Sequence, residues 1–171
     1  MALIKTLNGN TPNIGDNCFL AETATIIGEV TIGNNCSIWY SAVLRGDVHF
    51  IKIGNNTNIQ DNATVHATYK KSPTTIGNNV TVAHGAIIHG CTIQDNVMIG
   101  MNAVVLDDAV VESNSIVAAG SVVTKGTTVE SGTVYAGIPA KKIKDISPEL
   151  LEGEILRIAN AYEMYSGWYK D

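Results

Sequence analysis

Three of the four histidines lie within one short stretch of the sequence, at positions 66, 84 and 89. Neutral imidazole is a common ligand of zinc and of other divalent transition metals. Three histidines on one ion leave the fourth position open for water, as in catalytic rather than structural zinc sites. We therefore interpret His66, His84 and His89 as ligands of a metal that could activate water at neutral pH.

The elements that position these histidines are predicted by a six-residue repeat. Aliphatic residues recur every six positions in four runs that together hold 19 repeats: 14–44, 53–65, 76–88 and 93–129. This period fits neither an amphipathic helix nor a long flat strand, but it suits short parallel strands joined by tight turns. At three repeats to a coil, the sequence predicts a parallel β-solenoid of about six coils.

Counting repeats places two of the histidines side by side. Leu44, Val65 and Ile88 are three repeats apart and should stack, so His66 and His89, which follow two of them, fall in one column. Neighbouring coils are about 4.8 Å apart, so the two imidazoles could bind one ion. The alternative is that they are exposed polar residues on a face of the solenoid.

His84 belongs to a different column. Ile59 and Val82 should stack, which places Asp61 beside His84. Five extended residues between His84 and His89 span up to about 15 Å, too far for both to bind one ion within a chain. We expect His84 to reach a neighbouring copy, and a closed trimer is the natural ring for a three-sided solenoid.

Three further side chains could support such a site. Gln60 has an amide that could aim a metal-bound hydroxide, although an exposed amide on a loop is the alternative. Arg45 and Asp47 could form an ion pair that fixes the register between subunits.

The end of the chain changes character after the repeats. Ser147, Pro148 and Glu149 form a helix start, with a capping hydroxyl, proline at the first helical position and an acid in the first turn. We expect residues 1–140 to form the solenoid, and residues 141–171 to form a C-terminal helix packed on it. Cys18 and Cys36, 18 positions apart, should be core thiols in adjacent coils.

Composition excludes several classes of partner. The formal net charge is −5, with no basic run, which argues against nucleic acid and anionic membranes. No apolar run approaches the roughly 18 residues of a membrane-spanning helix. Three cysteines and the absence of an N-terminal signal pattern favour the cytoplasm.

These motifs together resemble one family. RGDV at 45–48, NIQD at 58–61, His66, AHGAIIHGC at 83–91 and VYAGIPAK at 134–141 resemble the gamma-class carbonic anhydrases. The resemblance implies an all-β, left-handed parallel β-helix of hexapeptide repeats with a C-terminal α-helix. It also implies a homotrimer that hydrates CO2 reversibly to bicarbonate through a metal-bound hydroxide.

The same resemblance implies roles for individual residues. Zn2+, with Fe2+ or Co2+ as alternatives, would bind His66 and His89 of one chain and His84 of the next. Gln60 would orient the hydroxide, and Asn58 and Tyr135 would line the pocket, while the remaining polar residues of the motifs would form interface ion pairs: Arg45, Asp47 and Asp61.

Two departures from the family pattern affect the proton that catalysis must release. Val48 stands where a glutamate follows the aspartate in active members, and the loop at 67–75 has two lysines and no carboxylate. Proton-transfer groups typically contribute about 10²–10⁴-fold, so turnover should be slow. His49 could substitute, although we expect an exposed residue at the end of a strand.

Three functions therefore remain open from sequence alone. The first is the metal-dependent carbonic anhydrase, and the second is a non-catalytic metal-binding or assembly subunit. The third is a hexapeptide-repeat acyltransferase, which would need one histidine base rather than three metal ligands. Metal-dependent hydrolysis of another ester or thioester is a further alternative.

Overall fold

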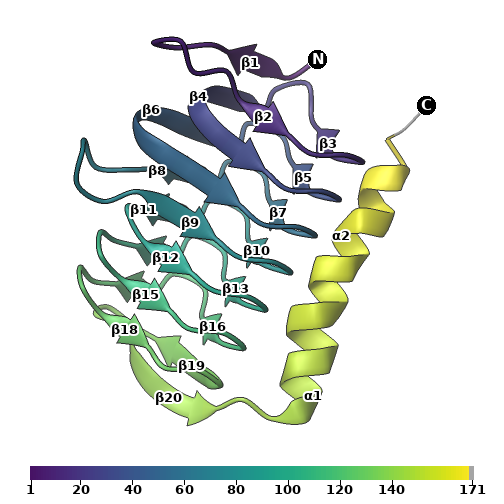
Figure 1. The fold of residues 1–171 in the computed structure, drawn as a ribbon. Coiled ribbons are helices and arrows are strands. Elements are labelled where there is room, and N and C mark those ends of the chain that lie inside the picture. Colours follow the sequence, from purple (N-terminus) through teal and green to yellow (C-terminus); the bar gives the residue numbers. More distant parts are fainter. Residues whose placement is uncertain (170–171) are drawn as a thin grey trace.

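The structure is a computed structural model that describes residues 1–169. The chain forms a parallel β-solenoid of about seven turns with one helix along its side (Figure 1), which confirms the predicted fold class. One more turn is present than the repeats predicted, and residues Leu3–Lys5 form a strand that pairs with Thr25–Ile27 of the coil below. Within residues 1–169, no helix is both long enough and apolar enough to span a bilayer.

The strands form two hydrogen-bonded sheets that wrap three faces. The larger sheet contains β1 (Leu3–Lys5), β2 (Asn13–Ile14), β4 (Thr25–Ile32), β6 (Val43–Ile53), β8 (Thr64–His66), β9 (Thr74–Ile76), β11 (Ile87–His89), β12 (Thr92–Ile93), β14 (Val104–Val105), β15 (Val110–Val111), β17 (Val122–Val123) and β18 (Thr128–Val129). The smaller contains β3 (Phe19–Leu20), β5 (Ser37–Ile38), β7 (Asn58–Ile59), β10 (Thr81–Val82), β13 (Met98–Ile99), β16 (Ile116–Val117), β19 (Thr133–Ala136) and β20 (Lys141–Asp145). The larger sheet covers two faces because β4 and β6 continue around a corner of the solenoid.

The aliphatic residue of each repeat points into the solenoid. Leu44, Val65, Ile88 and Val105 are aligned on successive coils and are fully buried. Their burial removes apolar surface from water in every coil, at about 25 cal/mol per Å². The stacking order predicted from the repeats is therefore confirmed.

Asparagines shape one corner of the solenoid. Asn56, Asn79, Asn96 and Asn114 all have positive φ, between 51° and 59°, which asparagine tolerates better than most residues. The amide of each donates to the next across the coils, at 2.8, 2.9 and 3.0 Å. This ladder keeps successive turns in register.

The helix covers the face formed by the smaller sheet. It comprises α1 (Pro148–Leu150), a π-helical segment η1 (Leu151–Leu156) and α2 (Arg157–Gly167). The Ser147 hydroxyl caps the start by accepting from the Leu150 N–H at 3.3 Å, as predicted. Trp39 of the solenoid packs edge-on against Tyr162, with ring centroids 5.2 Å apart, and so fixes the helix in place.

The segment predicted as C-terminal helix is not helical throughout. Residues Lys141–Asp145 form β20, which pairs antiparallel with β19 and closes the last coil. The helix begins at Pro148, and the last two positions of the predicted range 141–171 lie outside the described residues.

The three faces of the solenoid differ in the residues they present. One lies under the helix. The second, visible at the front of Figure 1 along β9, β12, β15 and β18, presents mainly threonine: Thr31, Lys52, Thr75, Thr92, Val110 and Thr128. The third, which we call the apolar face, presents Val43, Thr64, Ile87, Val104 and Val122 in one column.

Candidate metal centre

His66 and His89 lie next to each other at the ends of β8 and β11. Parallel register pairs the two residues directly, and the Nδ1 atom of His66 is 3.1 Å from the Nε2 atom of His89. Two nitrogens bound to one tetrahedral zinc at 2.0–2.1 Å lie about 3.3 Å apart. The predicted column is therefore confirmed, and its spacing fits a shared ion.

The second nitrogen of each ring is held by a carboxylate. His66 Nε2 donates to Asp47 Oδ1 at 2.9 Å, and His89 Nδ1 donates to Asp107 Oδ1 at 2.6 Å. With these protons in place, the two facing nitrogens both present lone pairs. A cation between them would stabilise that arrangement, and carboxylates commonly orient metal-binding histidines in this way.

His84 lies apart from this pair, on the turn after β10. Its Nδ1 is 2.7 Å from Asp61 Oδ2, as the column argument predicted, and its Nε2 is 3.4 Å from the Tyr162 hydroxyl on α2. The side chain is 45% exposed. Across residues 1–169, no three His, Cys, Asp or Glu side chains of this chain are grouped closely enough to hold an ion.

The carboxylates are held in their charged form. Burial raises the pKa of Asp47, but hydrogen bonds from His66 and Arg45 outweigh it and hold the pKa below its usual value. Asp107 behaves in the same way, with Thr68 and His89 as its donors. Arg45 also pairs with Asp47 at 2.5 Å within the chain, whereas Asp61 contacts His84.

Gln60 is buried, so the alternative of an exposed loop amide was wrong. The side chain is 3% exposed; its Oε1 accepts from the His84 backbone N–H at 3.2 Å, and its Nε2 donates to Asn58 Oδ1 at 3.0 Å. Asn58 in turn donates to Thr81 Oγ1 at 2.9 Å. This buried chain fixes the direction of the amide beside His84.

Tyr135 is placed elsewhere in the chain. It lies on β19, three strands from β10 in the smaller sheet, which is about 14 Å at 4.8 Å per strand. Its ring is buried in the core. Within a single chain, the structure therefore does not bring Tyr135 to the histidines.

Two functional neighbours escaped the sequence analysis. Asp107 comes two residues after Val105, one coil beyond Ile88, so extending the column by a single coil would have found it. Tyr162 lies on α2. It lines a cavity of about 460 Å³ between helix and solenoid, together with Gln60 and His84. Burial raises its pKa to about 12, so the hydroxyl stays neutral.

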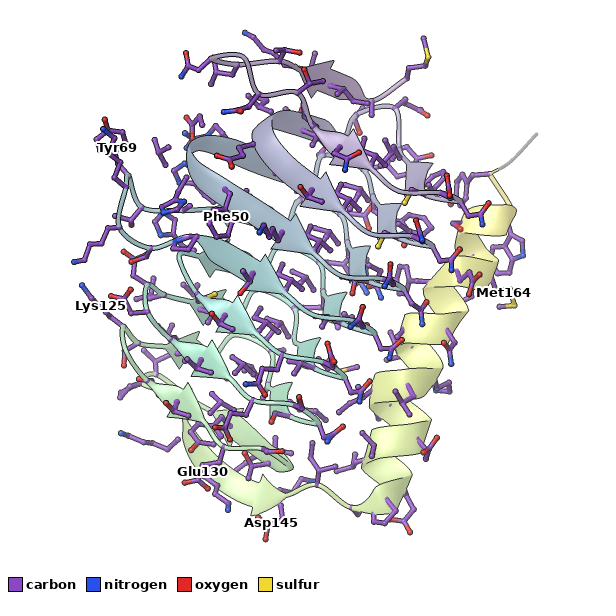
Figure 2. All side chains as sticks on the ribbon, in the orientation of Figure 1. Phe50, Tyr69, Lys125, Glu130, Asp145 and Met164 are labelled. Atoms are coloured by element: carbon purple, nitrogen blue, oxygen red, sulfur yellow. The ribbon has the colours of Figure 1, made fainter. Side chains whose placement is uncertain are left out.

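The loop after His66 is tied to the same corner. Thr68 donates to Asp107 and Ser72 donates to Asp108, both at 2.6 Å. Figure 2 shows Tyr69 of this loop and Lys125 projecting from one corner of the solenoid. No carboxylate occurs between positions 67 and 75.

His49 differs from its expectation. It lies within β6 rather than at a strand end, is half-buried, and accepts from the Phe50 N–H at 2.9 Å.

Comparison with known proteins first defines the class. A family model for the bacterial transferase hexapeptide (six repeats) matches residues 11–46 and 90–125. A solved Bacillus cereus structure, described as an acetyltransferase, has a TM-score of 0.95 and 34% identity, and the match covers 99% of this chain and 97% of that one. The chain is thus built as a hexapeptide-repeat protein.

Sequence relatives narrow the assignment. The chain is 46% identical to mitochondrial gamma carbonic anhydrase 2 of Arabidopsis thaliana over 90% of its own length, but it spans only 56% of that protein. It is 39% identical to a carbonic anhydrase of Geobacillus kaustophilus, covering 98% of this chain and 91% of the relative. The chain therefore belongs to the gamma carbonic anhydrase family.

Proposed function

We propose that this protein hydrates CO2 reversibly to bicarbonate at a metal centre completed between copies of a homotrimer. The observation that carries the proposal is the His66–His89 pair, whose facing nitrogens are 3.1 Å apart while both other nitrogens are bonded to carboxylates. A pair of this kind lacks only a third ligand. His84 is half-exposed and is not grouped with the pair within residues 1–169, so a neighbouring copy is the natural source.

The apolar face supports this assembly. Ile87 is 42% exposed at its centre, and no element within residues 1–169 covers it. The face continues along β8 and β11 directly to His66 and His89. Docking a second copy there would bury the aliphatic column and place a partner next to the pair. Such a contact joins two different surfaces, and repeating it closes a ring of three when each copy is rotated by a third of a turn.

The chemistry divides between the ion and the protein. Zn2+, or alternatively Fe2+ or Co2+, lowers the pKa of bound water and so supplies a hydroxide nucleophile near neutral pH. Asp47, Asp107 and Asp61 hold the three imidazoles in the tautomer that leaves a lone pair for the ion. Gln60 uses one amide hydrogen on Asn58 and keeps the other for a ligand in the cavity.

Proton release is the weak step. The nearest loop contributes Lys70 and Lys71 but no carboxylate, and Val48 is apolar. His49 and Val48 lie in β6, where the Val48 carbonyl accepts from the Lys70 N–H at 3.3 Å. We expect turnover to be lower by about 10²–10⁴-fold than with a positioned proton acceptor.

The test is CO2 hydration by stopped-flow, on protein purified without oxygen and reconstituted separately with Zn2+ and Fe2+. Metal content and assembly mass are measured for each sample. His84→Ala should abolish hydration and weaken metal binding, whereas His49→Ala serves as a matched control that keeps the metal. One ion per chain without hydration in the unmutated protein would refute the anhydrase.

Two alternatives have specific support. The absent proton acceptors favour a non-catalytic metal-binding subunit, which the same experiment would reveal as a loaded but inactive trimer. The likeness to the Bacillus cereus protein favours an acyltransferase. That activity would survive removal of the metal by a chelator, because it requires a single histidine base.

A further inference from the structure

Two cysteines occupy the same position in the first two hexapeptide coils. Cys18 precedes β3 and Cys36 precedes β5, and the register of these strands pairs Phe19 with Ser37. The N–H of Phe19 donates to the carbonyl of Cys36 at 2.9 Å, so the backbones of the two cysteines lie against each other.

Their thiols point in one direction along the solenoid. The Cys18 thiol donates to the Gly33 carbonyl at 3.1 Å, and the Cys36 thiol donates to the Gly54 carbonyl at 3.0 Å. The Cys18 thiol thereby lies beside Cys36. The neighbouring Cys18 thiol, together with burial, raises the pKa of Cys36.

The two thiols differ in access to solvent. Cys36 is 2% exposed, whereas Cys18 is partly exposed. Cys18 is therefore the thiol that an oxidant reaches first, because reaction requires an accessible thiolate. Cys36, on the adjacent coil, would resolve the product once its thiol turns from the Gly54 carbonyl toward Cys18.

The backbone spacing suits a cross-link. Adjacent strands place the two Cα atoms about 4.8 Å apart, within the range of about 4.4–6.8 Å seen in disulfides. We propose that Cys18 and Cys36 form a reversible disulfide between the first two hexapeptide coils when the protein meets a low-molecular-weight disulfide. In-register side chains keep their Cβ atoms slightly wider than in most disulfides, so the bond should be readily reduced.

The exchange balances in two steps. The Cys18 thiolate attacks a sulfur of glutathione disulfide, forming a mixed disulfide and releasing one glutathione thiolate. Cys36 loses its proton and attacks the Cys18 sulfur, forming the protein disulfide and releasing the second glutathione. Both protein thiols are oxidised, and one glutathione disulfide is reduced to two thiols.

The position of the bond decides its effect. In a solenoid each coil contacts only its neighbours, so the end coils open first. The cysteines precede Phe19 and Trp39 in their coils, and these two rings lie 5.0 Å apart at a tilt of 52°. Closing this loop of 18 positions should raise the Tm by about 6–12 °C.

The experiment incubates the full-length protein with glutathione disulfide and maps disulfides by mass spectrometry of unreduced peptides. We expect one bond, between the peptides that contain Cys18 and Cys36, with two thiols lost on titration. The Tm should rise in oxidised protein and return on addition of dithiothreitol. Peptides that remain unlinked, or a linkage without any rise in Tm, would overturn the proposal.

Matched variants separate this bond from other oxidation. Cys18→Ser changes a partly exposed position and should abolish both the linked peptide and the Tm shift. Cys91 is buried, with a pKa raised to about 12 by burial, so Cys91→Ala should leave both unchanged. If Cys36→Ala fails to fold, Cys18→Ser alone decides the result; a Tm shift that persists in Cys18→Ser contradicts the assignment.

Discussion

Asp107→Ala removes the carboxylate that holds the His89 ring, and Asp107→Asn removes only its charge. Asp107 Oδ1 is 2.6 Å from His89 Nδ1, and its other oxygen accepts from Thr68 at 2.6 Å. Because both oxygens accept hydrogen bonds, the carboxylate is held in one orientation toward the His89 ring. The loss should appear in metal affinity, because an unheld imidazole must be ordered when the ion binds.

The size of the loss follows from the bond that is removed. Losing a carboxylate partner of a metal-binding histidine typically weakens binding by about 10–100-fold, or about 1.4–2.7 kcal/mol. A charge-assisted hydrogen bond is about twice as strong as a neutral one. We therefore expect Kd for Zn2+ to rise by about 100-fold in Asp107→Ala and by about 10-fold in Asp107→Asn.

The assay is competition for Zn2+ against a chromophoric chelator, with thermal unfolding run on each apoprotein. Asp108→Asn is the matched control, because this neighbouring carboxylate bonds to Ser72 and pairs with Lys125 rather than with a histidine. Its Kd should stay within about threefold of the unmutated protein. Equal losses in the Asp107 and Asp108 variants, or no loss in Asp107→Ala, would refute the reasoning.

Three other predictions follow from the fold. Ile87→Glu places a charge on the apolar face and should convert the proposed trimer to monomers in analytical ultracentrifugation, whereas Thr92→Glu on the threonine face should not. Gly28→Ala should lower the free energy of unfolding by about 2–4 kcal/mol in urea, because its φ is +76° and a Cβ would lie 2.3 Å from the Gly46 carbonyl oxygen; unchanged stability would contradict this. The pKa of Asp47 is lowered in the folded chain. Its contribution to the free energy of unfolding is therefore complete above the unfolded pKa of about 3.9 and is lost as pH falls through the lower folded pKa. In urea titrations at a series of pH values, Asp47→Asn should reduce this loss of stability in acid.

The fold and the histidine column could be predicted because both follow from counting positions in the six-residue repeat. A six-residue period fixes which residues point inward, and parallel strands without offset fix which residues are neighbours. His66 and His89 therefore lie side by side as predicted, and Asp61 contacts His84. The start of the helix could also be predicted, because Ser147 and Pro148 act within a single helical turn.

The rest of the site depends on contacts that no local pattern encodes. Tyr162 reaches His84 only because the aromatic contacts of Trp39 set the rotation of the helix against the solenoid. Gln60 is buried beside the cavity between the helix and the solenoid, a position that the period alone could not show. The burial of His49 reflects the continuation of β6 around a corner, where the repeat is interrupted.

The loop between Ala67 and Pro73 stands outside the stacking order of the coils. It joins β8 to β9, which lie on different faces, and two hydroxyl–carboxylate bonds, from Thr68 and Ser72, tie it to the coil beneath. Under the proposed function, assembly and metal binding would depend mainly on residues of the coils, whereas the route for protons would depend on this insertion. The two traits can therefore evolve separately: exchanging one surface loop could move a descendant between enzyme and structural subunit while every coil stays the same.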